Sequence, residues 1–382
     1  MKGREWLVSA CLVALMFLVA TMGGPPPSRG AAPAVTIGVA APLTGPRALL
    51  GRNFRQGVEL ALDEINEAGG VLGQPLRVIF EDDQGDNPGA AINAVNRLIS
   101  VHKVPLMLGP HYSVAQMATQ KIYCDAKVVS LTGASGVPVT AQGCKYVFRV
   151  RASDAIVAPA LARYIKEHLK FTKVAILYVN DDFGKAGAAA AAAALDSVGL
   201  KPVAVESHNA GDKDFTAQLT KIVRAGAESV VTWTHDTDAA LVLRQARELN
   251  LNLRFAGPTS LSAPSFIALA GEAAEGVFSA NDFVPTVPTE RVQSFVKRYT
   301  RRYKTLPEIW ASAYYDATWL AAKAIQSARS TDPDKVRAAL LSLRYSGVLA
   351  DFRFDPNGDG NHQIHIVTVR NGQAEWVTTV KF

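Results

Sequence analysis

The chain has 382 residues, of which 48% are hydrophobic, so it can bury a large core, and its length favours two domains. The formal net charge is +6, and it falls to +4 without the charged residues of the N-terminal segment, which are Lys2, Arg4, Glu5 and Arg29. No run of lysine and arginine and no basic stripe with interleaved aromatic residues occurs, which argues against nucleic acid as a partner.

Residues 1–34 have the pattern of a secretory signal peptide and leader. Lys2 and Arg4 precede an apolar core at Leu12–Ala20, and small residues follow, so we expect cleavage between Gly23 and Ala34. The apolar core is too short to span a bilayer, and no later segment reaches about 18 continuous apolar residues. The sequence therefore predicts an exported protein, located most simply in a bacterial periplasm.

The first part of the mature chain alternates short apolar runs with amphipathic segments, and glycine and proline mark the boundaries. Such runs are typical of buried parallel strands that alternate with helices. The expected elements are strand Val35–Ala41, helix Arg52–Ala68, strand Leu76–Glu81, a helix opened by Pro88, strand Val104–Leu108, a helix that begins at Ser113, and strand Val128–Leu131.

Two serines follow neighbouring strands of this predicted sheet. Ser113 lies where a helix begins, so its hydroxyl and the free N–H groups of the first turn can face one anion. Ser135 lies in a loop of small residues that lets backbone N–H groups approach a ligand. Ligands of open α/β sheets bind outside the carboxyl ends of the strands, where both serines fall. The simpler alternative is that Ser113 only caps its helix and Ser135 only turns the chain.

The mature chain contains two cysteines, Cys124 and Cys144, on either side of the Ser135 loop. In an oxidising compartment a disulfide that ties down this loop is the favoured interpretation, and two free buried thiols are the alternative. The seven histidines of the chain form no cluster with the spacing of metal ligands, so no metal site is predicted.

After strand Val147–Val150 and the polar residues 151–154, the alternation begins again. The expected elements are helix Ile156–Leu169, strand Lys173–Val179, an alanine-rich helix, strand Pro202–Glu206, a helix that carries Phe215 to Val223, strand Ser229–Thr234, a helix around Leu241–Leu249, and strand Leu253–Gly257. Two runs of alternating strands and helices predict two similar α/β lobes, each with a parallel sheet covered on both faces.

Near the C-terminus, Asp355–Gly360 is similar to the start of a calcium-binding loop. An EF-hand loop needs a carboxylate at its twelfth position, where this chain has Ile366. Because strands are expected on both sides, we predict a tight turn without calcium.

Seven segments of the mature chain, in this order behind a signal peptide, resemble the periplasmic leucine/isoleucine/valine-binding proteins, the solute-binding subunits of branched-chain amino acid ABC transporters. Each segment is weak evidence alone, and the set covers essentially the whole mature chain. The segments are Ile37–Gly51, Gly57–Leu76, the turn Gly109-Pro110-x-x-Ser113, Gly211–Leu219, Leu243–Leu251, Gly257–Ser260 and Ala313–Ile325.

The resemblance implies the type I periplasmic binding protein fold: two Rossmann-like lobes with parallel-rich sheets, joined by three crossovers and closing over a small ligand. We expect the crossovers near Arg151–Asp154, Ser279–Pro285 and Ser346–Asp351. The lobes are then residues 35–152 plus 284–347 and residues 153–283 plus 348–382. It also implies a monomer without a cofactor that binds a small carboxylate and delivers it to a membrane permease.

The carboxylate-binding half of the family's site is present in this sequence. Position by position, the family's carboxylate-holding serine matches Ser113, and its small-residue loop matches Ala134-Ser135. A bulky apolar contact before the first helix matches Leu50. The resemblance therefore supports the anion site that the two serines already indicate.

The half of the site that holds the ligand's ammonium departs from the family. Two cleft tyrosines match Phe183 and His235, and the acidic residue matches Thr259, whose neutral hydroxyl does not compensate a buried ammonium. Acidic residues nearby that could replace it, or that are solvated loop residues, are Asp181, Asp182, Asp236 and Asp238. We therefore expect a carboxylate that is not a plain aliphatic α-amino acid, such as an aromatic or keto acid.

No phosphate loop, nucleophile elbow or metal motif occurs, so the sequence predicts a binding protein and not an enzyme. In the transport interpretation, the ligand bridges two lobes and shifts the population towards a closed form that docks on a permease. The alternative is a periplasmic sensor that presents its ligand to a membrane receptor.

Overall fold

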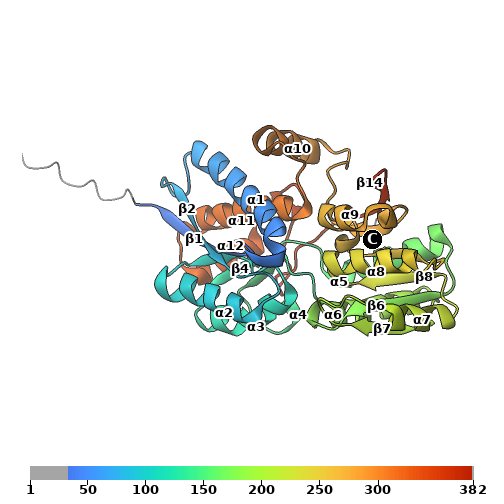
Figure 1. The fold of residues 1–382 in the computed structure, drawn as a ribbon. Coiled ribbons are helices and arrows are strands. Elements are labelled where there is room, and N and C mark those ends of the chain that lie inside the picture. Colours follow the sequence, from blue (N-terminus) through green and yellow to red (C-terminus); the bar gives the residue numbers. More distant parts are fainter. Residues whose placement is uncertain (1–32, 381–382) are drawn as a thin grey trace, which may run out of the picture. The chain divides into compact units, whose positions relative to one another are not determined.

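The computed structural model describes residues 33–380, and Figure 1 shows its helices and strands. The predicted signal peptide lies outside the described residues, apart from the last two residues of the leader. Among the described residues, no helix is at once long enough and apolar enough to cross a membrane.

The first sheet is parallel throughout and has the strand order β2-β1-β3-β4-β5. Its strands are β1 (Val35–Ala41), β2 (Leu76–Asp82), β3 (Leu106–Leu108), β4 (Val129–Thr132) and β5 (Val147–Arg149). Successive side chains of a strand point to opposite faces, so Leu106 and Leu108 join one core cluster and Met107 joins the other.

Helices cover both faces of this sheet, as the apolar runs of its strands require. One face packs against α1 (Ala48–Glu67), α10 (Glu290–Tyr303), α11 (Ile309–Ala328) and α12 (Pro333–Ser342). The other face packs against α2 (Pro88–Asn96), α3 (Ser113–Asp125) and the short α4 (Pro138–Ala141). The helices α10 to α12 come from a distant part of the sequence, and Figure 1 shows α11 beside α1.

The second sheet has the strand order β14-β13-β10-β9-β8-β6-β7. Its strands are β6 (Val174–Val179), β7 (Val205–His208), β8 (Ser229–Trp233), β9 (Arg254–Gly257), β10 (Phe278–Asn281), β13 (Ile364–Arg370) and β14 (Gln373–Val380). The strands from β6 to β10 pair in parallel, whereas β13 runs antiparallel to both of its neighbours. This parallel-rich α/β architecture is the predicted fold class.

The second sheet is also covered on both faces. On one face lie α5 (Asp154–Tyr164) and α6 (Asp182–Ser197). On the other face lie α7 (Thr216–Arg224), α8 (Asp236–Glu248) and α9 (Pro264–Ala270). The short strands β11 (Tyr345–Ser346) and β12 (Asp351–Phe352) pair with each other, and apolar residues of 348–354 join the core of the first sheet.

Several predicted boundaries shift in the structure. The strand predicted at Pro202–Glu206 is β7, which begins at Val205, since Pro202 has no N–H to donate to a ladder. The helix predicted to end at Leu169 is α-helical only as far as Tyr164, and Ile165–Leu169 form a wider π-helical turn. The tight turn predicted at residues 355–360 is confirmed.

Cys124 and Cys144 form the predicted disulfide, with a separation of 6.0 Å between their Cα atoms. Cys124 lies at the end of α3 and Cys144 precedes β5, so the bond closes the segment that contains Ser135.

We expect thiol titration of the denatured, unreduced mature protein to find no free cysteine. Replacing both Cys124 and Cys144 with alanine should lower the free energy of unfolding by about 3 kcal/mol, because an unfolded chain without the bond gains loop entropy. Urea unfolding of the parent and the double variant would measure this change. Two reactive thiols, or an unchanged free energy of unfolding, would contradict the prediction.

Candidate functional site

A cavity lies at the carboxyl ends of strands from both sheets. From the first sheet, segments that follow β3, β4 and β5 line it, and from the second sheet, segments that follow β6, β8 and β9 line it. This is the position at which open α/β sheets bind ligands. The cavity has a volume of about 60 Å³ for the centre of a water-sized sphere. That volume would hold about four to six waters, so the cavity suits a small molecule.

Six of the seven residues predicted to contact a ligand line this cavity, and one does not. The six are Leu50, Ser113, Ser135, Phe183, His235 and Thr259. Ala134 instead points into the core on the other side of its loop, while its neighbour Gly133 lines the cavity. Adjacent residues of an extended loop face opposite ways, which explains why Ala134 and Ser135 separate.

The end of the cavity at which an anion is predicted to bind is formed by α3 and the loop after β4. Ser113 is the first residue of α3 and Tyr112 precedes it as N-cap, so Ser113 does not cap the helix. Its Oγ instead accepts a hydrogen bond of 3.1 Å from the Gly136 N–H. The N–H groups of the first helical turn have no partner within the helix and carry the positive end of its dipole. This end of the cavity is therefore suited to a carboxylate.

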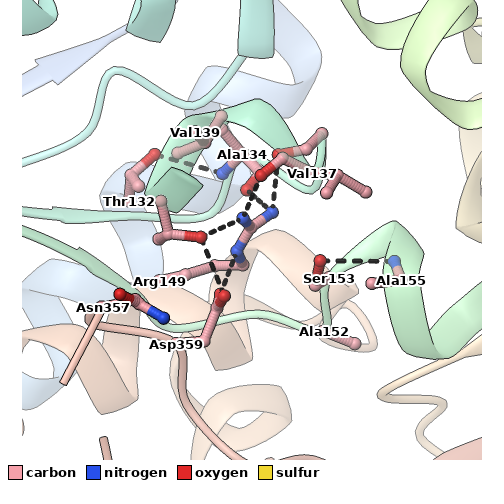
Figure 2. A network of polar contacts seen from close by, with 12 residues as sticks. Thr132, Ala134, Val137, Val139, Arg149, Ala152, Ser153, Ala155, Asn357 and Asp359 are labelled. Carbon is pink, nitrogen blue, oxygen red and sulfur yellow. Dashed lines mark hydrogen bonds and ion pairs between the residues drawn. The ribbon is translucent and has the colours of Figure 1, made fainter. Parts of the chain in front are cut away.

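Arg149, the last residue of β5, holds this loop in place, as Figure 2 shows. Its fully buried guanidinium donates through Nη1 to the carbonyl oxygens of Ala134 and Gly136, at 3.0 and 2.9 Å. Its Nε donates to Asp359 Oδ1 at 2.6 Å, and Asp359 Oδ2 accepts from the Thr140 hydroxyl at 2.8 Å. The turn at residues 355–360 thus anchors the anion-binding loop.

A glycine of that turn explains how it approaches β5 so closely. Gly358 has φ +88°, and a Cβ at this position would lie 2.0 Å from the carbonyl oxygen of Val147. Only glycine accepts this conformation and this contact without strain. Asp355 Oδ1 accepts from the N–H groups of Asn357 and Asp359, so it stabilises the turn.

On the second-sheet side, His235 and Phe183 form an aromatic wall. Their rings stack with centroids 5.0 Å apart, and His235 also contacts Tyr112 edge-on at 5.4 Å. His235 Nε2 lies 2.8 Å from Asp181 Oδ2. Burial would raise the pKa of Asp181, but the hydrogen bond from His235 lowers it below its ordinary value. Asp181 is therefore committed to His235.

Thr259 lies beside a cation that the sequence analysis did not single out. Arg151 Nη2 donates to Thr259 Oγ1 at 2.8 Å and pairs with Asp282 Oδ1 at 2.6 Å. Burial would raise the pKa of Asp282, but the charge of Arg151 lowers it, so the pair is ionised. The guanidinium also lies over the Trp310 ring, at 5.0 Å from its centroid. Arg151 and Trp310 both line the cavity.

Asp154, at the start of α5, is a second polar residue of the cavity that sequence analysis missed. It is 1% exposed, and burial raises the pKa of its carboxyl to about 6. Its Oδ2 accepts from Trp233 Nε1 at 3.3 Å, whereas its Oδ1 has no hydrogen-bond partner among the described residues. Oδ1 can therefore accept from a ligand or, when protonated, donate to one.

The four aspartates considered as replacements for the family's acid do not have that geometry. Asp182 is exposed, and Asp238 is buried outside the cavity, where it accepts from the Gly211 N–H. Asp236 does line the cavity, but Arg47 and Ser265 occupy its oxygens. The missed residues Arg151 and Asp154 lie in the polar stretch that was expected to cross between the lobes. Because a crossover between lobes lies beside the cleft, this position could have indicated that they line the cavity.

His111 is another missed residue of the cavity wall. Burial lowers the pKa of its imidazole well below the ordinary value, with Arg151 adding to the effect. The neutral ring contacts Trp310 edge-on at 4.5 Å, and its Nδ1 lies 3.2 Å from the Tyr314 hydroxyl. His111 therefore contributes a polar but uncharged surface.

Comparisons with known proteins agree with this fold and site. A family model for periplasmic binding proteins matches residues 34–374. The leucine-, isoleucine-, valine-, threonine- and alanine-binding protein of Pseudomonas aeruginosa is 30% identical over 86% of this chain and 88% of that protein. The leucine binding protein LivK from Thermotoga maritima has a TM-score of 0.84 at 26% identity, over 91% of this chain and 98% of its own.

A second similar structure is the solute binding protein of R. palustris in complex with 4-hydroxybenzoate. Its TM-score is 0.84 over 91% of this chain and 97% of its own, and its 19% identity supports the fold alone. The relatives are substrate-binding proteins of transporters and not enzymes. The predicted family is thus confirmed: the chain belongs to the periplasmic binding proteins of the type I fold, in the family of branched-chain amino acid ABC transporter substrate-binding proteins.

Proposed function

We propose that this protein is an exported solute-binding protein of an ABC importer, which takes a small carboxylate into the cavity and delivers it to a membrane permease. In this proposal one lobe surrounds each sheet, with residues 35–152 plus 284–347 in the first and residues 153–283 plus 348–382 in the second, apart from the apolar residues of 348–354, which pack into the core of the first sheet. A ligand that touches both sides favours the closed arrangement, because its contacts differ between open and closed forms. Family membership supports a transport role, and a sensor that presents its ligand to a receptor is the alternative.

The main support for a small carboxylate as ligand is that one cavity combines the predicted anion-binding end with the Arg151 guanidinium. The first turn of α3, with Ser113, offers hydrogen-bond donors to a carboxylate. Thr259 stands where the family's acid would hold an ammonium, and its partner is the Arg151 guanidinium. A positive ligand group at this point would meet a like charge.

The second candidate ligand is an α-amino acid, which the names of the relatives give as their ligand. Asp154 favours it, because the free Oδ1 of this buried carboxyl could accept from an ammonium. The two candidates therefore differ in the group beside the carboxylate.

Calorimetric titration of the mature protein, unfolded and refolded to remove any bound molecule, tests the ligand class. We expect micromolar or tighter binding of at least one aromatic, aliphatic or keto acid, and much weaker binding of leucine, isoleucine and valine. Mass spectrometry of the small molecule released on unfolding gives an independent identification. Tight binding of leucine with no binding of the acids would contradict the carboxylate proposal.

The pH dependence of binding also distinguishes the two ligand classes, through Asp154. The pKa of this carboxyl in the free protein is about 6. An anionic ligand beside it favours the protonated form and raises this pKa, so the affinity increases as the pH falls from about 8 to about 6. An ammonium lowers this pKa, so its affinity increases with pH instead. We expect the first result, measured by calorimetry across this range.

The Asp154→Asn variant is the matched control for this pH dependence. Other polar groups act on Asp154, namely Arg149, Arg151, Ser135 and Trp233, and the cavity also contains His235 with its partner Asp181. These groups remain in the variant, so the difference between the two pH profiles isolates the carboxyl. Identical pH profiles of the parent and the variant would show that the Asp154 carboxyl does not affect binding.

A further inference from the structure

We infer that Arg151 determines which acid this protein takes: the cavity binds a small acid with a hydrogen-bond acceptor at carbon 2, a 2-oxo or 2-hydroxy acid, in preference to the corresponding 2-amino acid. The inference rests on the proposed function, since it concerns the group beside a carboxylate in the same cavity. In the proposed site the protein donates the hydrogen bond, through Arg151, and the ligand accepts it. In a site that holds an ammonium with an acidic residue, the ligand donates and the protein accepts.

Arg151 is fixed in one orientation by its surroundings. Its Nε lies 3.3 Å from both carboxyl oxygens of Asp282, and its Nη2 lies 2.6 Å from Oδ1 of the same residue. The guanidinium packs over Trp310, and the residue is 5% exposed. A buried guanidinium that is held this way cannot turn aside for a ligand.

One end of this guanidinium is unused. Nη1 of Arg151 has no hydrogen-bond acceptor among residues 33–380, although Arg151 lines the cavity. A guanidinium donates and never accepts, so a ligand group that satisfies Nη1 must be an acceptor. A carbonyl or hydroxyl oxygen meets that requirement, and an ammonium does not.

Thr259 is also unable to serve an ammonium well. Its Oγ1 accepts from Arg151 Nη2 and donates its only proton to Asn281 Oδ1, at 3.2 Å. Asn281 in turn donates through Nδ2 to the Ser262 hydroxyl at 3.1 Å. The hydroxyl at the family's acidic position is thus part of a network that keeps Arg151 in place.

Ser113, Ser135 and Arg151 line the same cavity, so one ligand can contact both binding groups. When the carboxylate lies against the serines, the substituent at carbon 2 is the nearest group that can meet Arg151. Asp154 argues against the inference, since its free Oδ1 could accept a hydrogen bond from an ammonium.

Matched triplets of ligands test the inference by calorimetry on the full mature protein. One triplet is leucine, 4-methyl-2-oxopentanoate and 4-methylpentanoate, and the others are the corresponding series from phenylalanine and from alanine. In at least one series, we expect the 2-oxo acid to bind about tenfold or more tighter than the acid without a substituent, because an unsatisfied buried donor is costly. The amino acid should bind most weakly of the three.

Two variants keep the test independent of folding. Arg151→Met combined with Asp282→Asn removes both charges of the buried pair, so that neither is left alone, and should abolish the preference for the 2-oxo acid. Arg151→Lys keeps the positive charge but loses the fork, so it should still exclude the amino acid and weaken the 2-oxo acid. Arg291→Met, which removes an exposed arginine paired with Asp351, is the control and should bind like the parent.

The possible failures are distinguishable. If the unsubstituted acid binds as tightly as the 2-oxo acid, the inference is wrong and the proposed carboxylate function stands. If the amino acid binds most tightly, Asp154 and not Arg151 determines the ligand, and both proposals about the ligand class fail. If no compound of any series binds, the inference fails, and the ligand released on unfolding then decides whether the proposed function stands.

Discussion

Replacing Arg149 with methionine should lower the free energy of unfolding by about 3 kcal/mol, because two buried carbonyl oxygens and the carboxylate of Asp359, whose side chain is 32% exposed, lose a charged donor. The fully buried guanidinium serves Asp359 and the carbonyl oxygens of Ala134 and Gly136. Methionine fills much of the same space but donates nothing, so these buried acceptors lose their partner. Urea unfolding of the parent and the variant measures the difference.

The same substitution should also weaken ligand binding, because the loop that Arg149 anchors contains Ser135. The Arg149→Lys variant keeps the charge but not the fork of donors, so we expect an intermediate loss of stability. Lys145→Met is the control, since it removes an exposed ion pair with Asp334 that contributes little to stability. A stability loss for Arg149→Met as small as that of the control would show that the loop holds its shape without the network.

The positions of the two serines were predictable because their signals are local. A serine at the start of a helix and another after the next strand lie at the same edge of a parallel sheet, whatever the rest of the chain does. The structure brings Ser113 and Ser135 into one cavity. Ala134 was misplaced because the sequence does not show which way each residue of a short irregular loop faces.

The other end of the site was not predictable from local pattern. Arg151 acquires its role from Asp282 and Thr259, which are 131 and 108 residues away in the sequence. Contacts between residues so far apart in the sequence produce no recognisable spacing or periodicity. Arg149 is a similar case, since its partner Asp359 belongs to a turn that sequence analysis treated as an isolated feature.

The alternation of strands and helices was sufficient for the fold class, because apolar runs covered on both faces leave few other architectures. The sequence analysis assigned residues 348–382 to the second lobe, but it did not predict the hairpin of β13 and β14 or the antiparallel pairing of β13 with β10.

Replacing Arg47 with methionine should weaken the binding of every ligand by the same factor, about tenfold to a hundredfold, the range for a hydrogen bond between charged groups. Arg47 precedes α1 and is 7% exposed. Its Nη2 pairs with Asp86 Oδ2, beyond β2 of the first sheet, at 2.9 Å, and its Nη1 pairs with Asp236 Oδ1 at the start of α8, also at 2.9 Å. The residue therefore links segments of both sheets.

The factor should be common to all ligands because Arg47 itself does not line the cavity, whereas Asp236 does. An interaction between the two sides of a cleft contributes to the closure that all ligands share, so its loss reduces the competent population and not any one contact. Calorimetry with each acid that binds the parent gives the factor, and Asp236→Asn should produce a similar loss that is not additive with Arg47→Met. Lys145→Met supplies the control, since its exposed pair with Asp334 lies within the first lobe. A loss confined to one ligand would instead indicate a direct contact, and unchanged affinities would show that this ion pair plays no part in closure.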